Sequence, residues 1–274
     1  MRKYFVVFRA CDAVQAFNRL PRPFGLEKRQ LLQICFLSLY EALQKVPHEI
    51  HVIGDKLSDE TQRFFRRFPV TLTLATLGNE ESIRRAFALG LSRPDDEWVY
   101  FCEDDYLHQP QTFEYIDDFI SNREDILRDG RWKWRWSSIQ YEYLAARRLS
   151  VRPLFFFPPD YPDRYVGSFR RFSLMFLSRH CHWRQVTNTT FTFLGQARSL
   201  KRFRSTLERA PLGTNDALLS RELFGGLRFG RRGLCLSPVP GLSTHMHEGV
   251  MTPLVDWERL VEQYQHRLAA PALA

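Results

Sequence analysis

Residues 97–106 read EWVYFCEDDY, in which an apolar run ends at Cys102 and three carboxylates follow at once. The apolar run predicts a buried strand. A comparable run precedes it at residues 4–8 (YFVVF). Residues 49–53 (EIHVI) and the β-branched stretch 70–75 (VTLTLA) also read as strands. Short strands that are apolar throughout are typical of a parallel sheet covered on both faces.

Helical patterns separate these four predicted strands. The spacing of apolar residues predicts helices over residues 26–45, 59–67 and 79–91. Pro47 ends the first of them, and Ser58 is placed to cap the second. Strands that alternate with helices in this way predict an α/β fold, in which a mostly parallel sheet is flanked by helices.

The rest of the chain is less regular. Helices are expected at residues 110–128, 196–209, 215–224 and 255–268, and strands at 169–177 and 189–194. Residues 131–136 alternate charge and Trp, a pattern typical of a strand or of residues that line a groove. Residues 151–162 hold several Phe and Pro residues and are predicted to form a loop or a sheet edge. No internal repeat or clear linker divides the sequence, so we expect one domain over residues 1–274.

Composition excludes several classes of protein. The 274 residues are 44% hydrophobic and 26% charged, which is typical of a globular chain and not of a disordered or fibrous one. Five scattered cysteines without a CxxC pair favour a reducing compartment and argue against a disulfide framework or a zinc site. With no signal peptide and no transmembrane segment evident, a cytoplasmic protein is expected.

Polar residues follow three of the predicted strands. In a parallel sheet, ligands bind beyond the carboxyl ends of the strands. These ends carry residues 9–12 (RACD), Gly54-Asp55 and Glu103-Asp104-Asp105. No glycine-rich loop follows the first strand, which argues against a nicotinamide-binding or P-loop protein.

The three adjacent carboxylates repel one another unless a cation or a polar surrounding compensates them. Mn²⁺ or Mg²⁺ would do so, because both ions prefer oxygen ligands and keep open positions for substrate phosphates. The alternative is an acidic turn that caps the helix expected near residue 110.

A strand followed by Glu-Asp-Asp, about a hundred residues into such a chain, resembles the D-x-D motif of GT-A-fold glycosyltransferases, closest to the family 2-like group. The resemblance implies a divalent metal that bridges the diphosphate of a nucleotide sugar. Asp105 would then be the chief metal ligand, and Asp104 or Glu103 would lie near the ribose or the donor sugar. Glu103 stands where the motif's name has Asp.

The same resemblance gives roles to the ends of the first two strands. Asp55 would contact the nucleobase, and Arg9 and Asp12 the nucleoside. For Asp55 the alternative is a turn residue after Gly54.

Later in the chain, Asn215-Asp216 opens a predicted helix and partly matches the family's E-D motif, whose Asp is the general base of inverting members. A helix N-terminus would lower the basicity of Asp216, and the alternative is an acid that only stabilises the helix start. Near the C-terminus, His245 and His247 would share one face of a strand. The resemblance makes one of them a further metal ligand, with His245 favoured.

The resemblance therefore implies a metal-dependent, inverting glycosyltransferase of hexosyltransferase type, with a UDP-sugar as the expected donor. The acceptor would be a carbohydrate or a lipid-linked hydroxyl, as in polysaccharide biosynthesis. Residues 1–108 would bind the nucleotide, and residues 109–274 would bind the acceptor and carry the catalytic base. A retaining route stays open if Asp216 is not the base.

Two other functions stay open. A nucleotidyltransferase or phosphodiesterase would use the same acidic cluster, but it usually needs a second set of carboxylates, and no convincing set is evident. A nucleic-acid-binding protein would account for the net charge of +8 and the Arg-Trp alternation at residues 131–136. It would leave the acidic cluster without a role, so no nucleic-acid partner is expected.

Overall fold

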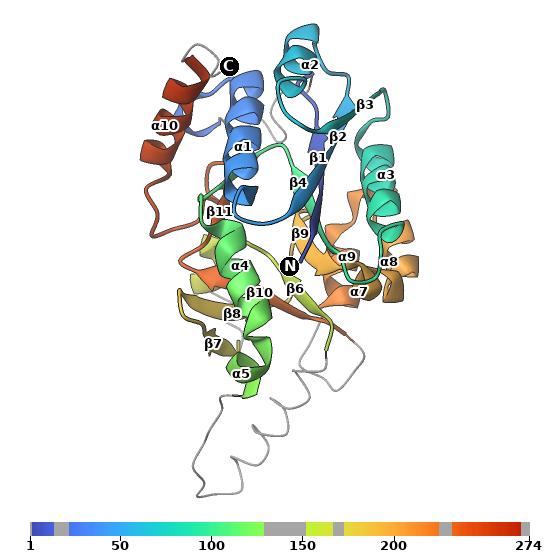
Figure 1. Ribbon diagram of the computed structural model, residues 1–274, viewed down its shortest axis with the longest axis vertical. Coiled ribbons are helices and arrows are strands. Elements are labelled where there is room, and N and C mark those ends of the chain that lie inside the picture. Colours follow the sequence, from blue (N-terminus) through green and yellow to red (C-terminus); the bar gives the residue numbers. More distant parts are fainter. Residues whose placement is uncertain (1, 14–21, 129–151, 167–172, 225–231, 270–274) are drawn as a thin grey trace, which may run out of the picture.

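The computed structural model describes residues 2–13, 22–128, 152–166, 173–224 and 232–269. These residues form a central sheet with the strand order β3-β2-β1-β4-β9-β6-β10-β8-β7 (Figure 1). Its first four strands are mutually parallel: β1 (Tyr4–Ala10), β2 (His48–Asp55), β3 (Thr71–Ala75) and β4 (Trp98–Glu103). The strand–helix alternation expected from the sequence is confirmed here.

The remaining strands extend the same sheet. They are β6 (Leu154–Phe156), β7 (Met175–Leu177), β8 (His182–Val186), β9 (Phe193–Gln196) and β10 (Leu234–Val239). Strand β9 is antiparallel to both of its neighbours, β4 and β6, and β8 is antiparallel to both β10 and β7. Strands β6 and β10 pair in parallel, so only β9 and β8 of the described strands of this sheet run opposite to the others. The sheet is therefore mixed but mostly parallel, which is the predicted fold class.

A separate two-stranded ladder joins distant parts of the chain. Strand β5 (Tyr106–His108) follows β4 after a tight turn and pairs antiparallel with β11 (Ser243–His245). This pairing sets His245 directly opposite Tyr106. It brings the late histidine beside the carboxylates that follow β4.

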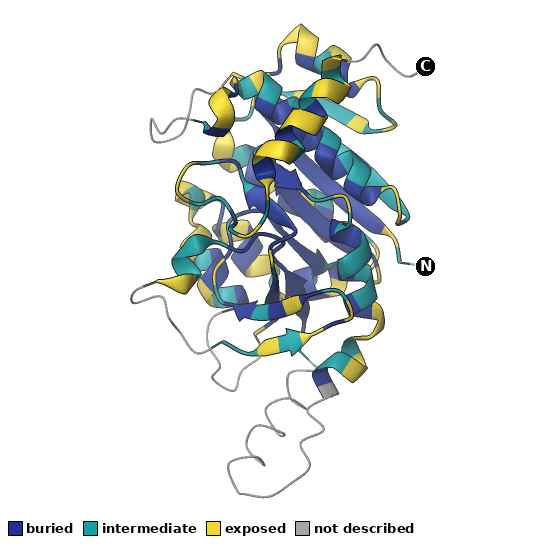
Figure 2. Ribbon diagram, turned by 90° about the vertical axis from the view of Figure 1, so that its left-hand side faces the viewer, coloured by how far each residue is buried: buried dark blue, intermediate teal, exposed yellow. Residues whose placement is uncertain are grey.

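Helices cover both faces of the sheet, because side chains on each strand alternate between two cores. Tyr4, Val6 and Phe8 of β1 belong to one core, and Phe5 and Val7 belong to the other. The first core is covered by α1 (Lys28–Leu43), α2 (Asp59–Phe65), α4 (Thr112–Ser121) and α5 (Arg123–Arg128). The second is covered by α3 (Asn79–Leu91), α7 (Ala197–Arg202), α8 (Arg204–Arg209) and α9 (Asp216–Leu223). Figure 2 shows the buried strands between the partly exposed helices.

The remaining helices are peripheral or short. Helix α10 (Trp257–Ala269) packs against α1 through a third apolar cluster. Three short 3₁₀ helices are η2 (Pro23–Gly25), η3 (Pro162–Tyr165) and η5 (Leu212–Thr214). Among the described helices, none is both long and apolar enough to cross a bilayer.

Several predictions for the second half were wrong or shifted. Residues 151–162 hold β6, an interior strand between β9 and β10, rather than only a loop or an edge. The helices expected at 110–128 and 196–209 are each interrupted, at Asn122 and Phe203. The strand expected at 189–194 lies at Phe193–Gln196. Residues 131–136 and the start of the strand expected at 169–177 lie outside the described residues.

Candidate functional site

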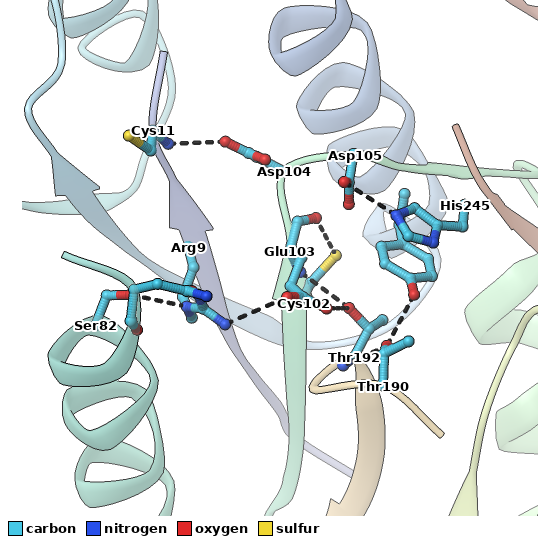
Figure 3. Close-up of polar contacts among 12 residues, drawn as sticks. Arg9, Cys11, Ser82, Cys102, Glu103, Asp104, Asp105, Thr190, Thr192 and His245 are labelled. Carbon is cyan, nitrogen blue, oxygen red and sulfur yellow. Dashed lines mark hydrogen bonds and ion pairs between the residues drawn. The ribbon is translucent and has the colours of Figure 1, made fainter. Parts of the chain in front are cut away.

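The candidate site lies where β1, β2 and β4 end, since the carboxyl ends of parallel strands meet at one edge. Strands β1 and β4 pair in a register that sets Arg9 beside Glu103. In the turn that follows β4, the side chains of Asp104 and Asp105 point in different directions, as Figure 3 shows.

Glu103 faces Arg9 and the loop before β9. Its carboxylate is 3.5 Å from an Arg9 guanidinium nitrogen and accepts a 3.3 Å hydrogen bond from the Thr192 hydroxyl. The Glu103 backbone N–H donates to the same hydroxyl, at 3.1 Å. Burial raises the pKa of the Glu103 carboxyl above its ordinary value, and Arg9 offsets only part of this rise.

Asp104 is buried and is bound by the protein itself. One carboxylate oxygen lies 2.5 Å from the Lys28 ammonium, and the other accepts from the Cys11 backbone N–H at 2.7 Å. Burial lowers the pKa of Lys28, but Asp104 and Asp105 together outweigh burial, so the Lys28 pKa is raised. The middle carboxylate is thus paired with a lysine of the protein, although burial still holds the pKa of Asp104 above its ordinary value.

Asp105 points toward His245 of β11. Asp105 Oδ2 lies 3.1 Å from His245 Nε2, whereas Asp105 Oδ1 is buried and has no hydrogen-bond partner. Burial by itself would raise the pKa of Asp105, but His245 and Lys28 outweigh it and hold that pKa below its ordinary value. The same contact raises the pKa of His245 against the opposite effect of burial.

His247 lies beyond the end of β11, so the prediction that it shares a strand face with His245 was wrong. Its backbone N–H turns back to the His245 carbonyl, at 2.8 Å. The two imidazole rings are 5.7 Å apart and tilted by 48°. His245 directly faces Asp105 of the acidic cluster.

The other residues predicted at the nucleotide end hold loops in place. Arg9 donates to the Ser82 hydroxyl at 3.2 Å and to Asn79 Oδ1 at 2.5 Å. Asp55 is buried and accepts from the backbone N–H groups of residues 77 and 78, at 2.7 and 2.9 Å. Asp55 therefore fixes the entry to α3, which in turn holds Arg9 beside Glu103.

The side chain of Asp12, which follows β1 in the sequence, contacts the first residues of α2. Its carboxylate accepts from the Ser58 backbone N–H at 3.0 Å and from the hydroxyls of Ser58 and Thr61, both at 2.5 Å. Since Ser58 is itself the N-cap residue of α2, Asp12 reinforces that cap.

Asp216 begins α9 and is exposed. One turn later on the same helix, the Ser220 hydroxyl accepts from the Thr189 backbone N–H at 3.0 Å, and Thr189 belongs to the loop that carries Thr192. Just before Asp216, the Gly213 N–H donates to Glu80 of α3 at 2.9 Å. These two bonds tie the start of α9 to segments that contact Glu103 and Arg9.

The pKa of Asp216 differs from the expectation based on the helix N-terminus. Desolvation by the surrounding protein raises the pKa of its carboxyl, and bonds to backbone N–H groups of the first turn lower it by less. A raised pKa brings a carboxylate closer to the range in which it can accept a proton near neutral pH.

Sequence reasoning missed three neighbours of the acidic cluster, Lys28, Thr192 and Tyr106. Lys28 gave a usable signal, since a cation in the first turn of a helix is unfavourable unless an anion lies nearby. Thr192 and Tyr106 gave none, because an isolated Thr or a buried Tyr in a strand needs no functional explanation.

The residues at this edge could bind a divalent cation through Asp105 and His245, although they do not form a complete metal site by themselves. Among the residues the structure describes, no group of three or more His, Cys, Asp or Glu side chains could hold a metal ion. Asp105 nevertheless has a buried oxygen without a partner, next to a histidine nitrogen. Two protein ligands are enough for Mg²⁺ or Mn²⁺ when substrate phosphates and water fill the other positions.

Comparisons with known proteins return similar structures only. Neither the models of known families nor the curated proteins include a match to this chain. One similar structure is the galactosyltransferase LgtC with donor and acceptor sugar analogs, at 9% identity and a TM-score of 0.47, with 97% of each chain covered. Another is S. aureus TarS 1–349, at 13% identity and a TM-score of 0.46, with 99% of this chain and 67% of that chain covered.

A third is a nucleotidyl transferase from Methanothermobacter, at 12% identity and a TM-score of 0.42, with 96% of this chain and 98% of that chain covered. The likeness concerns the overall arrangement of the sheet and its helices.

Proposed function

We propose that this chain is a metal-dependent glycosyltransferase, which moves a sugar from a nucleotide-diphosphate sugar to a hydroxyl acceptor. The observation that carries the proposal is the pair of Asp105 and His245 at the ligand-binding edge of the sheet, with one Asp105 oxygen buried and unpartnered. A buried carboxylate oxygen without a partner lowers the stability of the folded protein unless a ligand or an ion binds it.

On the donor side, Asp105 and His245 would hold Mn²⁺ or Mg²⁺. Bound there, the cation would neutralise the charge of the leaving diphosphate. Arg9, held by Ser82 and Asn79, keeps Glu103 turned toward the β1–β4 edge. Glu103 is thereby placed to accept hydrogen bonds from donor hydroxyls.

On the acceptor side, Asp216 would serve as general base. The acceptor oxygen forms a bond to the anomeric carbon, the bond from that carbon to the diphosphate breaks, and the acceptor proton passes to Asp216. A single displacement of this kind inverts the anomeric configuration. The raised pKa of Asp216 and its two links to the loops around Glu103 and Arg9 support this role.

For the substrates, we propose a UDP-sugar as donor and a carbohydrate or lipid-linked acceptor, as in polysaccharide biosynthesis in the cytoplasm. Residues 130–235 are strongly basic, which suits an acceptor that carries phosphate or another acidic group.

A thermal-shift screen of nucleoside diphosphates, with and without Mn²⁺, tests this function. We expect one nucleotide to raise the melting temperature only when Mn²⁺ is present, and we expect Asp105→Asn to abolish that joint effect. Asp96→Asn is the matched control, because Asp96 is an exposed carboxylate just before the same strand. A nucleotide that stabilises Asp105→Asn and the wild type equally would contradict the proposal.

Product analysis separates glycosyl from nucleotidyl transfer. With a nucleotide sugar and a hydroxyl acceptor, glycosyl transfer releases a nucleoside diphosphate. Nucleotidyl transfer instead joins a nucleoside triphosphate to a sugar phosphate and releases pyrophosphate. Pyrophosphate release without any sugar transfer would favour the second reaction.

A further inference from the structure

The far side of the His245 ring is in contact with Tyr161, a residue that the proposed chemistry does not use. The Tyr161 hydroxyl lies 3.1 Å from His245 Nδ1, opposite the nitrogen that faces Asp105. Tyr161 directly precedes η3 and packs edge-on against Phe157, with ring centroids 5.4 Å apart. The imidazole is thus bound on both of its nitrogens.

A second contact holds the plane of the ring. Tyr106 stacks on His245 with centroids 4.8 Å apart and an interplanar angle of 9°. Stacking alone does not orient the imidazole, because a half-turn about χ2 keeps the plane and exchanges each nitrogen with a carbon. In the turned ring, a carbon would face Asp105. The Tyr161 hydroxyl distinguishes the two orientations, since only one of them offers it a nitrogen.

The Tyr161 hydroxyl is also the first link in a row of hydroxyls. It lies 2.8 Å from the Tyr106 hydroxyl, which lies 2.8 Å from Thr190 Oγ1. With the imidazole proton on Nδ1, that N–H donates to Tyr161, Tyr161 donates to Tyr106, and Tyr106 donates to Thr190. Each donor from His245 to Tyr106 then has an acceptor. His245 Nε2 carries a proton while it donates to Asp105, and it presents its lone pair when a cation takes the place of that proton.

We infer that Tyr161 is a positioning residue that fixes the ring orientation and the tautomer of His245, so that Nε2 is presented to a divalent cation at Asp105. This inference rests on the proposed function, because it requires the cation site. Partners that orient a histidine ligand through its second nitrogen commonly change metal affinity 10- to 100-fold when they are removed.

The test is Mn²⁺ binding to the nucleotide-free protein, measured by the electron paramagnetic resonance signal of free Mn²⁺. We expect Tyr161→Phe to weaken binding by about 10- to 100-fold, since the hydroxyl is lost and the ring packing is kept. Tyr165→Phe is the matched control, because it removes a phenol of the same segment whose hydroxyl binds Asp160 instead. Its Mn²⁺ affinity is expected to equal that of the wild type.

A double-mutant cycle shows whether Tyr161 acts through His245. In a His245→Ala background, Tyr161→Phe is expected to change Mn²⁺ affinity no further. A structural defect would instead lower the affinity in both backgrounds, and that result would overturn the inference, as would wild-type affinity in the single variant.

Thr190→Val gives a second variant that leaves Tyr161 in place. It removes the end of the hydroxyl row, and we expect weaker Mn²⁺ binding by a smaller factor than in Tyr161→Phe. An unchanged affinity would contradict the role given to the row. If the wild type binds no Mn²⁺ with or without the nucleoside diphosphate that the thermal-shift screen selects, the proposed metal-dependent function fails; if it binds and Tyr161→Phe binds equally well, only this inference fails.

Discussion

At the scale of single residues, three consecutive carboxylates have three different surroundings. Asp104 is neutralised by Lys28, Glu103 lies between Arg9 and Thr192, and Asp105 faces His245. The sequence predicts that the cluster matters and that Asp105 differs from its neighbours. It could not predict the partners, because the nearest of them in sequence is still dozens of residues away.

These surroundings separate a structural carboxylate from a functional one. Asp104→Asn leaves the Lys28 ammonium largely buried without its counter-charge, so we expect a loss of about 3 kcal/mol in the free energy of unfolding. Urea unfolding followed by circular dichroism measures it. A variant as stable as the wild type would show that the ion pair does not support the fold.

Asp105→Asn is expected to act on turnover instead. It removes a negative charge from the proposed cation site, so Mn²⁺-dependent sugar transfer should fall by about 100-fold or more. The assay is release of nucleoside diphosphate, with Asp96→Asn as the control. Full activity in Asp105→Asn would remove the metal site from the mechanism.

Asp216 makes a third prediction at this scale. Asp216→Asn should lower kcat by about 10²- to 10⁴-fold and leave Mn²⁺ and nucleotide binding unchanged, because a general base acts on the acceptor alone. Steady-state kinetics measures the change in kcat, and the thermal-shift screen measures the binding of Mn²⁺ and nucleotide. Glu208→Gln, an exposed acid on α8, serves as the control. Unchanged kcat would assign the base to another group.

At the scale of elements, the first half of the chain follows its sequence pattern closely. Strands β1 to β4 and helices α1 to α3 lie within a few residues of the predicted ranges, because continuous apolar strands alternate with amphipathic helices there. Strand β6 was missed because it is only three residues long (LFF) and because Pro158 and Pro159 follow soon after it. The β5–β11 ladder could not be predicted, since its strands are three residues each and far apart in the chain.

Helix α3 shows how closely these layers pack beneath the site. Its Gly90 faces Phe101 of β4, and a Cβ atom there would lie 2.5 Å from the Phe101 ring. We expect Gly90→Ala to destabilise the protein by about 1–3 kcal/mol, despite the higher helix propensity of alanine. Thermal unfolding measures the effect. A stabilised variant would mean that α3 can move away from β4 at little cost.

At the scale of the whole molecule, the site joins residues from both ends of the chain. Arg9, Glu103 and Asp105 meet His245 only because β1, β4 and the β5–β11 ladder converge at one edge. The rule that ligands bind beyond the ends of parallel strands predicts this edge from the sequence. The hydroxyl row from Tyr161 to Thr190 depends on tertiary contacts between distant segments, so no local sequence pattern predicts it.

The stability of the whole molecule should depend on pH through His108. This residue is fully buried, and burial lowers its pKa from 6.5 to about 3. Between these two values the unfolded chain binds a proton that the folded chain does not, so stability falls as the pH falls through this range. The slope is about 1.4 kcal/mol per pH unit for one such group.

Replacing the imidazole isolates this contribution. We expect His108→Gln to be less stable at neutral pH, because the Tyr100–His108 hydrogen bond is altered, but to lose less stability than the wild type between pH 6.5 and pH 4. Urea unfolding at a series of pH values measures the difference. Parallel pH profiles would show that His108 does not control acid sensitivity.

The most direct measurement of the proposed site is an anomalous-scattering map from crystals grown with Mn²⁺ and the nucleoside diphosphate that the thermal-shift screen selects. The prediction is one manganese peak within bonding distance of Asp105 and His245, in contact with the diphosphate and not with Asp104. A bound nucleotide with no manganese at Asp105, or manganese bound elsewhere in the chain, would contradict the account.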